Sequence, residues 1–220
     1  MLHIFDVDNT VINHTSAWYF LLEALGTGVI RYSQIRALPL EWIRYKLGKP
    51  NMDFIENAVK HLGGLERSTL ERTAEDAFLK RIKPNIFAGS SALIRGALSR
   101  GEEVIFATSS LDIIILPLAR FLGIECSITS KLDFCDGRTT GSVVEDSCFG
   151  YKKMSAVEKW LNANGYSADS ACFYSDSYTD LPLLKFCGKA VAVNPDGILL
   201  KEAKKHGWEI LHFKKTIKNV

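Results

Sequence analysis

Two aspartates one residue apart stand at the end of the first apolar run of the chain. The run at residues 2–5 has the composition of a short buried strand, and Asp6-Val7-Asp8-Asn9-Thr10 follows it directly. Residues i and i+2 of an extended chain point to the same side, so Asp6 and Asp8 should leave the strand together. Two adjacent carboxylates repel each other unless a proton or a metal ion lies between them. The pair therefore predicts chemistry that involves one or the other.

Polar residues also follow three later segments that have the composition of strands. These residues are Thr108, Ser109 and Ser110 after 103–107, Asp176, Ser177, Thr179 and Asp180 after 171–175, and Asn194 and Asp196 after 189–193. One polar strand exit is ordinary turn chemistry. In a parallel sheet, however, the carboxyl ends of the strands share one edge, where ligands bind. The four exits together therefore predict a single site at this edge.

Asp6, Asp8, Asp176 and Asp180 would supply four carboxylates to that site. Oxygen ligands suit a hard divalent cation, and Mg²⁺ typically takes one or two carboxylates together with waters and a phosphate. The hydroxyl of Thr108 can donate a hydrogen bond to an anionic oxygen. The sequence therefore favours Mg²⁺ as the cofactor.

A lysine is also needed to compensate the charge of a phosphoryl group during transfer. Lys152 and Lys153 both stand at a predicted helix start, where the helix dipole favours an anion. Lys153 is the better candidate because apolar residues at Met154, Val157 and Trp160 anchor the helix face beneath it. Whether Lys152 shares the role stays open at this point.

Alternating helices and strands after Pro84 predict an α/β fold with a Rossmann-like, doubly wound parallel sheet. Asp136-Gly137, between extended segments in 131–145, predicts a small β-hairpin insertion. Residues 13–84 have helical periodicity, with helices expected at 16–25, 32–47, 53–62 and 68–82, the last beginning with a capping box of Ser68 and Glu71. We expect a catalytic core of residues 1–12 and 85–220 and an inserted helical-bundle cap of residues 13–84.

The composition excludes several classes of protein. The chain has 220 residues, 47% of them hydrophobic, and a net charge of +2 without a basic block, which argues against nucleic-acid binding. No leader precedes the first strand and no run reaches the roughly 18 apolar residues of a membrane span, so we expect neither a signal peptide nor membrane insertion. Five cysteines without a CxxC pair indicate buried thiols in a reducing cytoplasm. The sequence does not indicate an oligomeric state.

Four motifs in order resemble those of the haloacid dehalogenase superfamily of phosphohydrolases, in its phosphoserine-phosphatase-like branch. They are Phe5-Asp6-Val7-Asp8-Asn9-Thr10, Val104-Ile105-Phe106-Ala107-Thr108, Gly150-x-x-Lys153 and Tyr174-Ser175-Asp176-Ser177-x-x-Asp180-Leu181-Pro182. The first and fourth are specific, whereas the second alone is weak. The helical segment after the first strand resembles the cap that this family places there.

The resemblance implies a Mg²⁺-dependent phosphatase that hydrolyses a small phosphomonoester through an aspartyl-phosphate. Asp6 would be the nucleophile, and Asp8 would protonate the leaving oxygen and then deprotonate the attacking water. The carboxylates of Asp6 and Asp176 and the backbone carbonyl of Asp8 would bind the metal, with Asp180 orienting its waters. Thr108 and Lys153 would hold the transferred phosphoryl oxygens. Thr10, Ser109 and Thr179 are further candidates for binding the phosphate.

Asp8 argues against a dehalogenase, because those relatives do not need a second acid. A phosphotransferase of the same fold and a non-catalytic binding protein that kept the fold stay open. The substrate is also open. Phosphoserine phosphatases bind the substrate amino group with an acidic residue on the first cap helix, but residues 9–22 contain no Asp or Glu, and Glu23 comes late. This departure argues against phosphoserine and leaves histidinol phosphate and sugar or lipid head-group phosphates.

Overall fold

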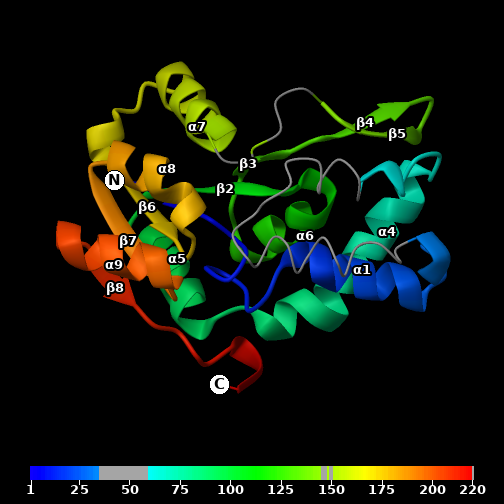
Figure 1. The fold of residues 1–220 in the computed structure, drawn as a ribbon, viewed down its shortest axis with the longest axis horizontal. Helices are drawn as coiled ribbons and strands as arrows, with labels where there is room; N and C mark the ends of the chain where they lie inside the picture. The colour runs from blue at the N-terminus through cyan, green and yellow to red at the C-terminus, as the bar shows by residue number, and fades with distance from the viewer. Residues whose placement is uncertain (35–58, 145–147, 149–150, 220) are drawn as a thin grey trace.

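The computed structural model describes residues 1–34, 59–144, 148 and 151–219 (Figure 1). Its main sheet consists of β1 (Leu2–Phe5), β2 (Glu103–Leu111), β3 (Cys126–Ser130), β6 (Ala171–Ser175), β7 (Lys189–Val193) and β8 (Glu209–Leu211). The strands are all parallel, in the order β3-β2-β1-β6-β7-β8. The predicted α/β fold class is confirmed.

Helices cover both faces of the sheet (Figure 1). They are α1 (Ser16–Gly26), α4 (Arg67–Ala77), α5 (Ala88–Ser99), α6 (Asp112–Leu122), α7 (Tyr151–Ala163), α8 (Leu181–Phe186) and α9 (Gly197–His206). Successive residues of β1 enter opposite hydrophobic clusters, Ile4 one and Phe5 the other, because strand side chains alternate between faces. Burial on both faces explains why β1 is an unbroken apolar run rather than an alternating one.

β1 lies in the middle of the sheet, paired with β2 on one side and β6 on the other. In this register Phe5 is opposite both Phe106 and Tyr174. The residues that follow β1 therefore emerge between the carboxyl ends of β2 and β6. This is the arrangement that the polar strand exits predicted.

The part of the predicted cap that the structure describes, residues 13–34 and 59–84, contains helices and turns but no β-strand element. α1 packs against α4 and against η2 (Phe78–Ile82), a π-helical turn that continues α4. The helix predicted at 32–47 and most of that predicted at 53–62 lie outside the described residues. The division into a core and a cap stays a prediction.

The predicted capping box of Ser68 and Glu71 is wrong. α4 begins at Arg67, and its N-cap residue Glu66 makes no side-chain hydrogen bond. The Arg67 N–H instead donates to the Gly137 carbonyl at 2.9 Å. A helix start needs partners for its first N–H groups, and here a backbone carbonyl far along the chain supplies one.

The hairpin is confirmed, as β4 (Leu132–Cys135) and β5 (Arg138–Val143). Its turn residues Asp136 and Gly137 have φ values of 48° and 75°, the left-handed conformation of a type I′ turn. The expected end of the second strand was too early, because β2 runs to Leu111. Its pairing with β3 shifts between Ala107 and Leu111, so the intervening hydroxyl residues lie in an irregular strand end rather than a loop.

All five cysteines are free, as expected. Cys148, Cys172 and Cys187 are buried, but Cys135 is exposed on the hairpin, so the expectation of buried thiols was wrong there. Among the described residues, no helix is long and apolar enough to cross a membrane.

Candidate active site

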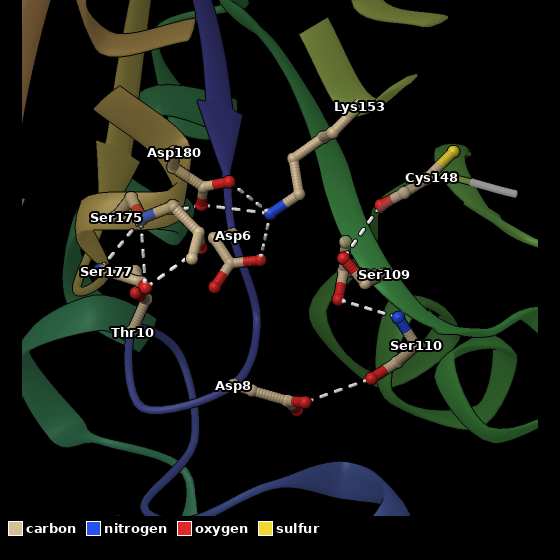
Figure 2. A network of polar contacts seen from close by, with 12 residues as sticks. Asp6, Asp8, Thr10, Ser109, Ser110, Cys148, Lys153, Ser175, Ser177 and Asp180 are labelled. Atoms are coloured by element: carbon tan, nitrogen blue, oxygen red, sulfur yellow. Dashed lines mark hydrogen bonds and ion pairs between the residues drawn. The ribbon is translucent and has the colours of Figure 1, made fainter. Parts of the chain in front are cut away.

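Asp6 is buried at the point where β1 ends (Figure 2), with 6% of its surface exposed. Its backbone N–H donates to the Tyr174 carbonyl at 2.9 Å, which continues the pairing of β1 with β6 by one residue. The sheet therefore fixes the backbone that carries the predicted nucleophile. Burial raises the pKa of Asp6 to about 7, against the lowering effect of Lys153.

Lys153 bridges two of the predicted carboxylates (Figure 2). Its Nζ lies 2.9 Å from Asp6 Oδ1 and 2.9 Å from Asp180 Oδ2, and the residue is 4% exposed. Burial alone would lower the pKa of Lys153, but the charges of Asp180 and Asp6 raise it above its ordinary value. The lysine is therefore a permanent cation at the carboxyl edge of the sheet.

Lys152 is exposed, although it is the neighbour of Lys153 on α7. The preference for Lys153 therefore agrees with the geometry. Gly150, which begins the third motif, lies outside the described residues.

Ser175, the last residue of β6, fixes the orientation of Asp180. Its Oγ donates to Asp180 Oδ2 at 2.7 Å, and the same carboxylate accepts from Lys153. Ser175 is part of the fourth sequence motif, but the sequence gave no reason to assign this serine a role in the active site. In this structure the Asp180 carboxylate is the partner of Lys153, and its assignment to metal binding stays a prediction.

Asp8 is held from two directions that the sequence did not reveal. The Ser16 backbone N–H donates to Asp8 Oδ1 at 2.8 Å. The Ser110 hydroxyl donates to Asp8 Oδ2 at 3.0 Å (Figure 2). Burial raises the pKa of Asp8, while hydrogen bonds from Ser16 and Ser110 oppose the change. A carboxyl group with a raised pKa suits an acid that must hold a proton.

Asp176 follows β6 and is the fourth predicted carboxylate. Thr10 Oγ1 donates to Asp176 Oδ1 across 3.5 Å, and the Asp176 carbonyl accepts from the Asp196 N–H at 2.8 Å. Burial and the nearby charges of Asp6 and Asp180 raise the pKa of Asp176 well above its ordinary value. Asp176 is thus close enough to Asp6 for the two charges to repel each other.

The remaining predicted phosphate-binding residues lie in the same strand ends. Thr108 is buried, and its Oγ1 accepts from the Ser110 N–H at 3.2 Å. The Ser109 hydroxyl donates to the Cys148 carbonyl at 2.7 Å, and the Thr179 hydroxyl lies 2.9 Å from that of Ser177. These contacts are within the protein, so phosphate binding by Thr10, Thr108, Ser109 and Thr179 stays a prediction.

The charges fit a divalent cation. Asp6, Asp8, Asp176 and Asp180 gather around one buried lysine. Burial raises the pKa values of Asp6, Asp8 and Asp176, and the charge of Asp180 adds to the rise at Asp6 and Asp176. Among the described residues, however, no three acidic, histidine or cysteine side chains form a complete metal cage. Mg²⁺ suits such an open donor set, because it commonly keeps several waters and takes few carboxylates.

A family model described as haloacid dehalogenase-like hydrolase matches residues 4–185, most of the chain and all four motifs. The chain belongs to this family. The predicted family is confirmed, and with it the expectation of a hydrolase.

Curated relatives of this haloacid dehalogenase-like hydrolase include a histidinol-phosphatase of Neisseria meningitidis, 33% identical over 97% of this chain and 99% of the relative. Another is a phosphoserine phosphatase of Mycobacterium tuberculosis, 29% identical over 96% of this chain and 70% of the relative. Phosphatase names in both support the prediction of a phosphoric monoester hydrolase.

Two solved structures support the fold. A protein of unknown function from Bordetella pertussis has a TM-score of 0.86 and 26% identity, covering 96% of this chain and 97% of that one. A substrate-bound phosphoserine phosphatase has a TM-score of 0.70 and 22% identity, covering 96% of this chain and 91% of that one. Because the sequence identity to the phosphoserine phosphatase structure is only 22%, this similarity shows the fold alone.

Proposed function

We propose that the protein is a Mg²⁺-dependent phosphatase that hydrolyses a small phosphomonoester through an aspartyl-phosphate formed on Asp6. One observation carries the proposal: the buried Lys153 amine lies 2.9 Å from Asp6, with the separately held Asp8 two residues further on. A nucleophile, a fixed cation and a potential acid thus share one sheet edge. Membership of a hydrolase family with phosphatase-named relatives supports this reading.

The first step forms a bond between an Asp6 carboxylate oxygen and phosphorus. The bond from phosphorus to the ester oxygen breaks, and Asp8 donates its proton to the departing alkoxide. Lys153 and Thr108 stabilise the negative phosphoryl oxygens, which is where charge compensation lowers the barrier. Covalent catalysis by a carboxylate divides one slow reaction into two easier steps.

The second step releases inorganic phosphate. Asp8, now ionised, accepts a proton from a water molecule whose oxygen attacks phosphorus, and the bond to Asp6 breaks. Mg²⁺, held by the Asp6 and Asp176 carboxylates and the Asp8 carbonyl, would neutralise charge on the phosphoryl group and on these carboxylates. Asp6 returns as a free carboxylate, and Asp8 is protonated again for the next turnover.

Histidinol phosphate is the first substrate to test, because the relative named histidinol-phosphatase matches over nearly its whole length. The structure also bears on phosphoserine. Glu23, the first acidic residue of the predicted cap, is buried and accepts from Lys80 at 2.7 Å and Arg81 at 3.0 Å. Its carboxylate is therefore already neutralised and is not free to bind a substrate amino group.

The test is phosphate release from a panel of phosphomonoesters with Mg²⁺, including histidinol phosphate, phosphoserine and sugar phosphates. We expect turnover of at least one compound, loss of turnover with a chelator, and no turnover by Asp6→Asn. Full activity of Asp6→Asn would refute the covalent mechanism. An alcohol that diverts phosphate from water would instead identify a phosphotransferase.

A further inference from the structure

Two linked serine hydroxyl groups lie next to Asp8. Ser16 and Ser110 are both buried, with 0% and 8% of their surface exposed, and their hydroxyl oxygens lie 2.7 Å apart. Ser110 also donates to Asp8 Oδ2 at 3.0 Å. Neither serine belongs to the carboxylate and lysine set that the motifs indicate.

The direction of each hydrogen bond follows from the number of donors. A serine has one hydroxyl hydrogen, and Ser110 uses it on Asp8. The Ser16 hydroxyl must then be the donor to Ser110 in their 2.7 Å contact. Ser16 in addition donates its backbone N–H to Asp8 Oδ1 at 2.8 Å. Asp8 thus accepts one hydrogen bond on each oxygen.

The two serines come from different parts of the fold. Ser110 lies at the end of β2 in the sheet, whereas Ser16 is the first residue of α1, where an N–H group has no partner within the helix. Their hydrogen bonds to Asp8 therefore connect the sheet with α1, the first helix after the Asp6–Thr10 motif. A carboxyl group fixed in this way has little freedom to rotate away from the reacting atoms.

We propose that Ser110, supported by the Ser16 hydroxyl, is a positioning residue that orients Asp8 for proton transfer to the leaving oxygen. The proposal rests on the proposed phosphatase function. The Ser110 hydroxyl on Oδ2 and the Ser16 backbone N–H on Oδ1 together fix the plane of the Asp8 carboxyl group, which keeps its proton aligned with the leaving oxygen. Without the hydroxyl, Asp8 is still present but its proton is less often aligned with the substrate.

The effect of Ser110→Ala should depend on the basicity of the leaving oxygen if Ser110 orients Asp8, and should not depend on it if Ser110 is merely structural. An alkyl phosphate releases a strongly basic oxygen that needs the proton, whereas p-nitrophenyl phosphate releases a weakly basic one that does not. We expect Ser110→Ala to lower kcat/KM for glycerol phosphate about 10- to 100-fold, part of the 10²–10⁴-fold that general acid catalysis supplies. For p-nitrophenyl phosphate the loss should be less than about threefold.

The second chemical step, hydrolysis of the aspartyl-phosphate, provides a second readout. Asp8 must also accept a proton from water, so with p-nitrophenyl phosphate Ser110→Ala should release a burst of nitrophenolate before a slow steady state. Ser110→Thr keeps a hydroxyl and should restore most of the loss. Ser16→Ala keeps the backbone N–H and should show a smaller change in the same direction.

Ser91→Ala, which alters a buried serine on α5 outside the site, is the matched control and should leave both substrates unaffected. Circular dichroism and thermal melting confirm that each variant is folded. Equal losses on the two substrates, or no loss on either, would overturn the proposal while an inactive Asp6→Asn still supports the phosphatase. A parent protein that hydrolyses neither these two substrates nor any member of the panel would overturn both.

Discussion

At the scale of single residues, the site depends on which of two neighbouring lysines faces inward. Lys153 is buried between Asp6 and Asp180, while Lys152 points to solvent from the same helical turn. A helix turns by about 100° per residue, so adjacent side chains cannot share one environment. One of the two is therefore part of the charged centre, and the other is free to change.

Lys153→Met should lower kcat/KM at least about 100-fold, the usual cost of removing a group that stabilises transition-state charge. Steady-state kinetics with the best substrate of the panel measures this loss. Lys152→Met is the control and should stay within about twofold of the parent. A large loss in Lys152→Met together with an active Lys153→Met would contradict the assignment of Lys153.

At the scale of elements, α1 must be fixed because it carries the N–H that holds Asp8. Glu23, near its other end, binds Lys80 and Arg81 of η2, and Lys80 also pairs with Asp76 of α4. These contacts join α1 to the α4–η2 segment on the side away from Ser16. The hydrogen bond with Lys80 is the largest influence that lowers the pKa of Glu23, against the effect of burial.

Glu23→Gln should lower the free energy of unfolding at pH 7 by about 2 kcal/mol, the range for buried hydrogen bonds to charged groups. Because the pKa of Glu23 is lowered in the folded state, this stabilisation is present above its unfolded pKa and disappears as pH falls through the folded value. Urea unfolding of parent and variant at pH 7 and pH 3.5 measures the difference, which should shrink at low pH. Glu71→Gln, at an exposed pair with Arg67 4.0 Å away, should change little.

The hairpin of β4 and β5 is bound to the turn that precedes α4. The Gly64 N–H donates to the Thr139 carbonyl at 2.7 Å, and the Thr139 N–H donates to the Leu65 carbonyl at 2.9 Å. A Cβ on Gly141, whose φ is +80°, would lie 3.2 Å from the Gly63 Cα. Glycine is required here both for its conformation and for the close approach of two backbones.

Gly141→Ala should therefore destabilise the protein by about 2 kcal/mol or more, of which left-handed strain accounts for roughly 1–2. Gly137→Ala is the matched control, because Gly137 has a φ of +75° in the same hairpin but open space around it. Denaturant unfolding of both variants separates the two contributions. Equal losses would mean that the contact with Gly63 contributes nothing.

At the scale of the whole molecule, the charge at the carboxyl edge of the sheet departs from the near-neutral balance of the chain. The net charge is only +2 over 220 residues. Four carboxylates nevertheless meet around one buried lysine at the end of β1 and β6, and burial raises the pKa values of Asp6, Asp8 and Asp176. The fold thus concentrates negative charge at one place, where protons and Mg²⁺ should compete.

Metal-free protein should lose stability as pH rises from about 5 to 8. A carboxyl group with a raised folded pKa stabilises the protein below its unfolded pKa, and this contribution is lost as pH rises through the folded value, about 7 for Asp6. Mg²⁺ binds the ionised groups, so the increase in Tm that it causes should grow over the same range. At 100 times its Kd the ion would add about 2.7 kcal/mol.

Thermal melting with Mg²⁺ or with a chelator, at pH 5.5, 6.5 and 8, measures this competition. Asp176→Asn should abolish most of the shift caused by the metal, whereas Asp136→Asn, on the exposed hairpin turn, should keep it. A shift that is independent of pH would show that the raised carboxyl groups do not bind the ion.

Much of the architecture followed from the sequence because its signals are local. An apolar run that ends in Asp-x-Asp and an Asp-Gly turn depend only on backbone preferences and on side-chain periodicity. These placed Asp6, Asp8 and Asp176 at strand ends, and the phase of α7 favoured Lys153. The start of α4 was missed because the partner of its N–H is a hairpin carbonyl rather than a nearby side chain.

Sequence alone therefore determined the parallel α/β fold, the family and the strand ends at which the charged residues lie. Only the tertiary structure decided how those residues are held: Ser175 on Asp180, and Ser16 and Ser110 on Asp8. Ser110 and Asp8 are 102 positions apart, and Ser16 and Ser110 are 94 apart. No periodicity or propensity connects residues over such a distance, because their contact exists only after the sheet and α1 have packed together.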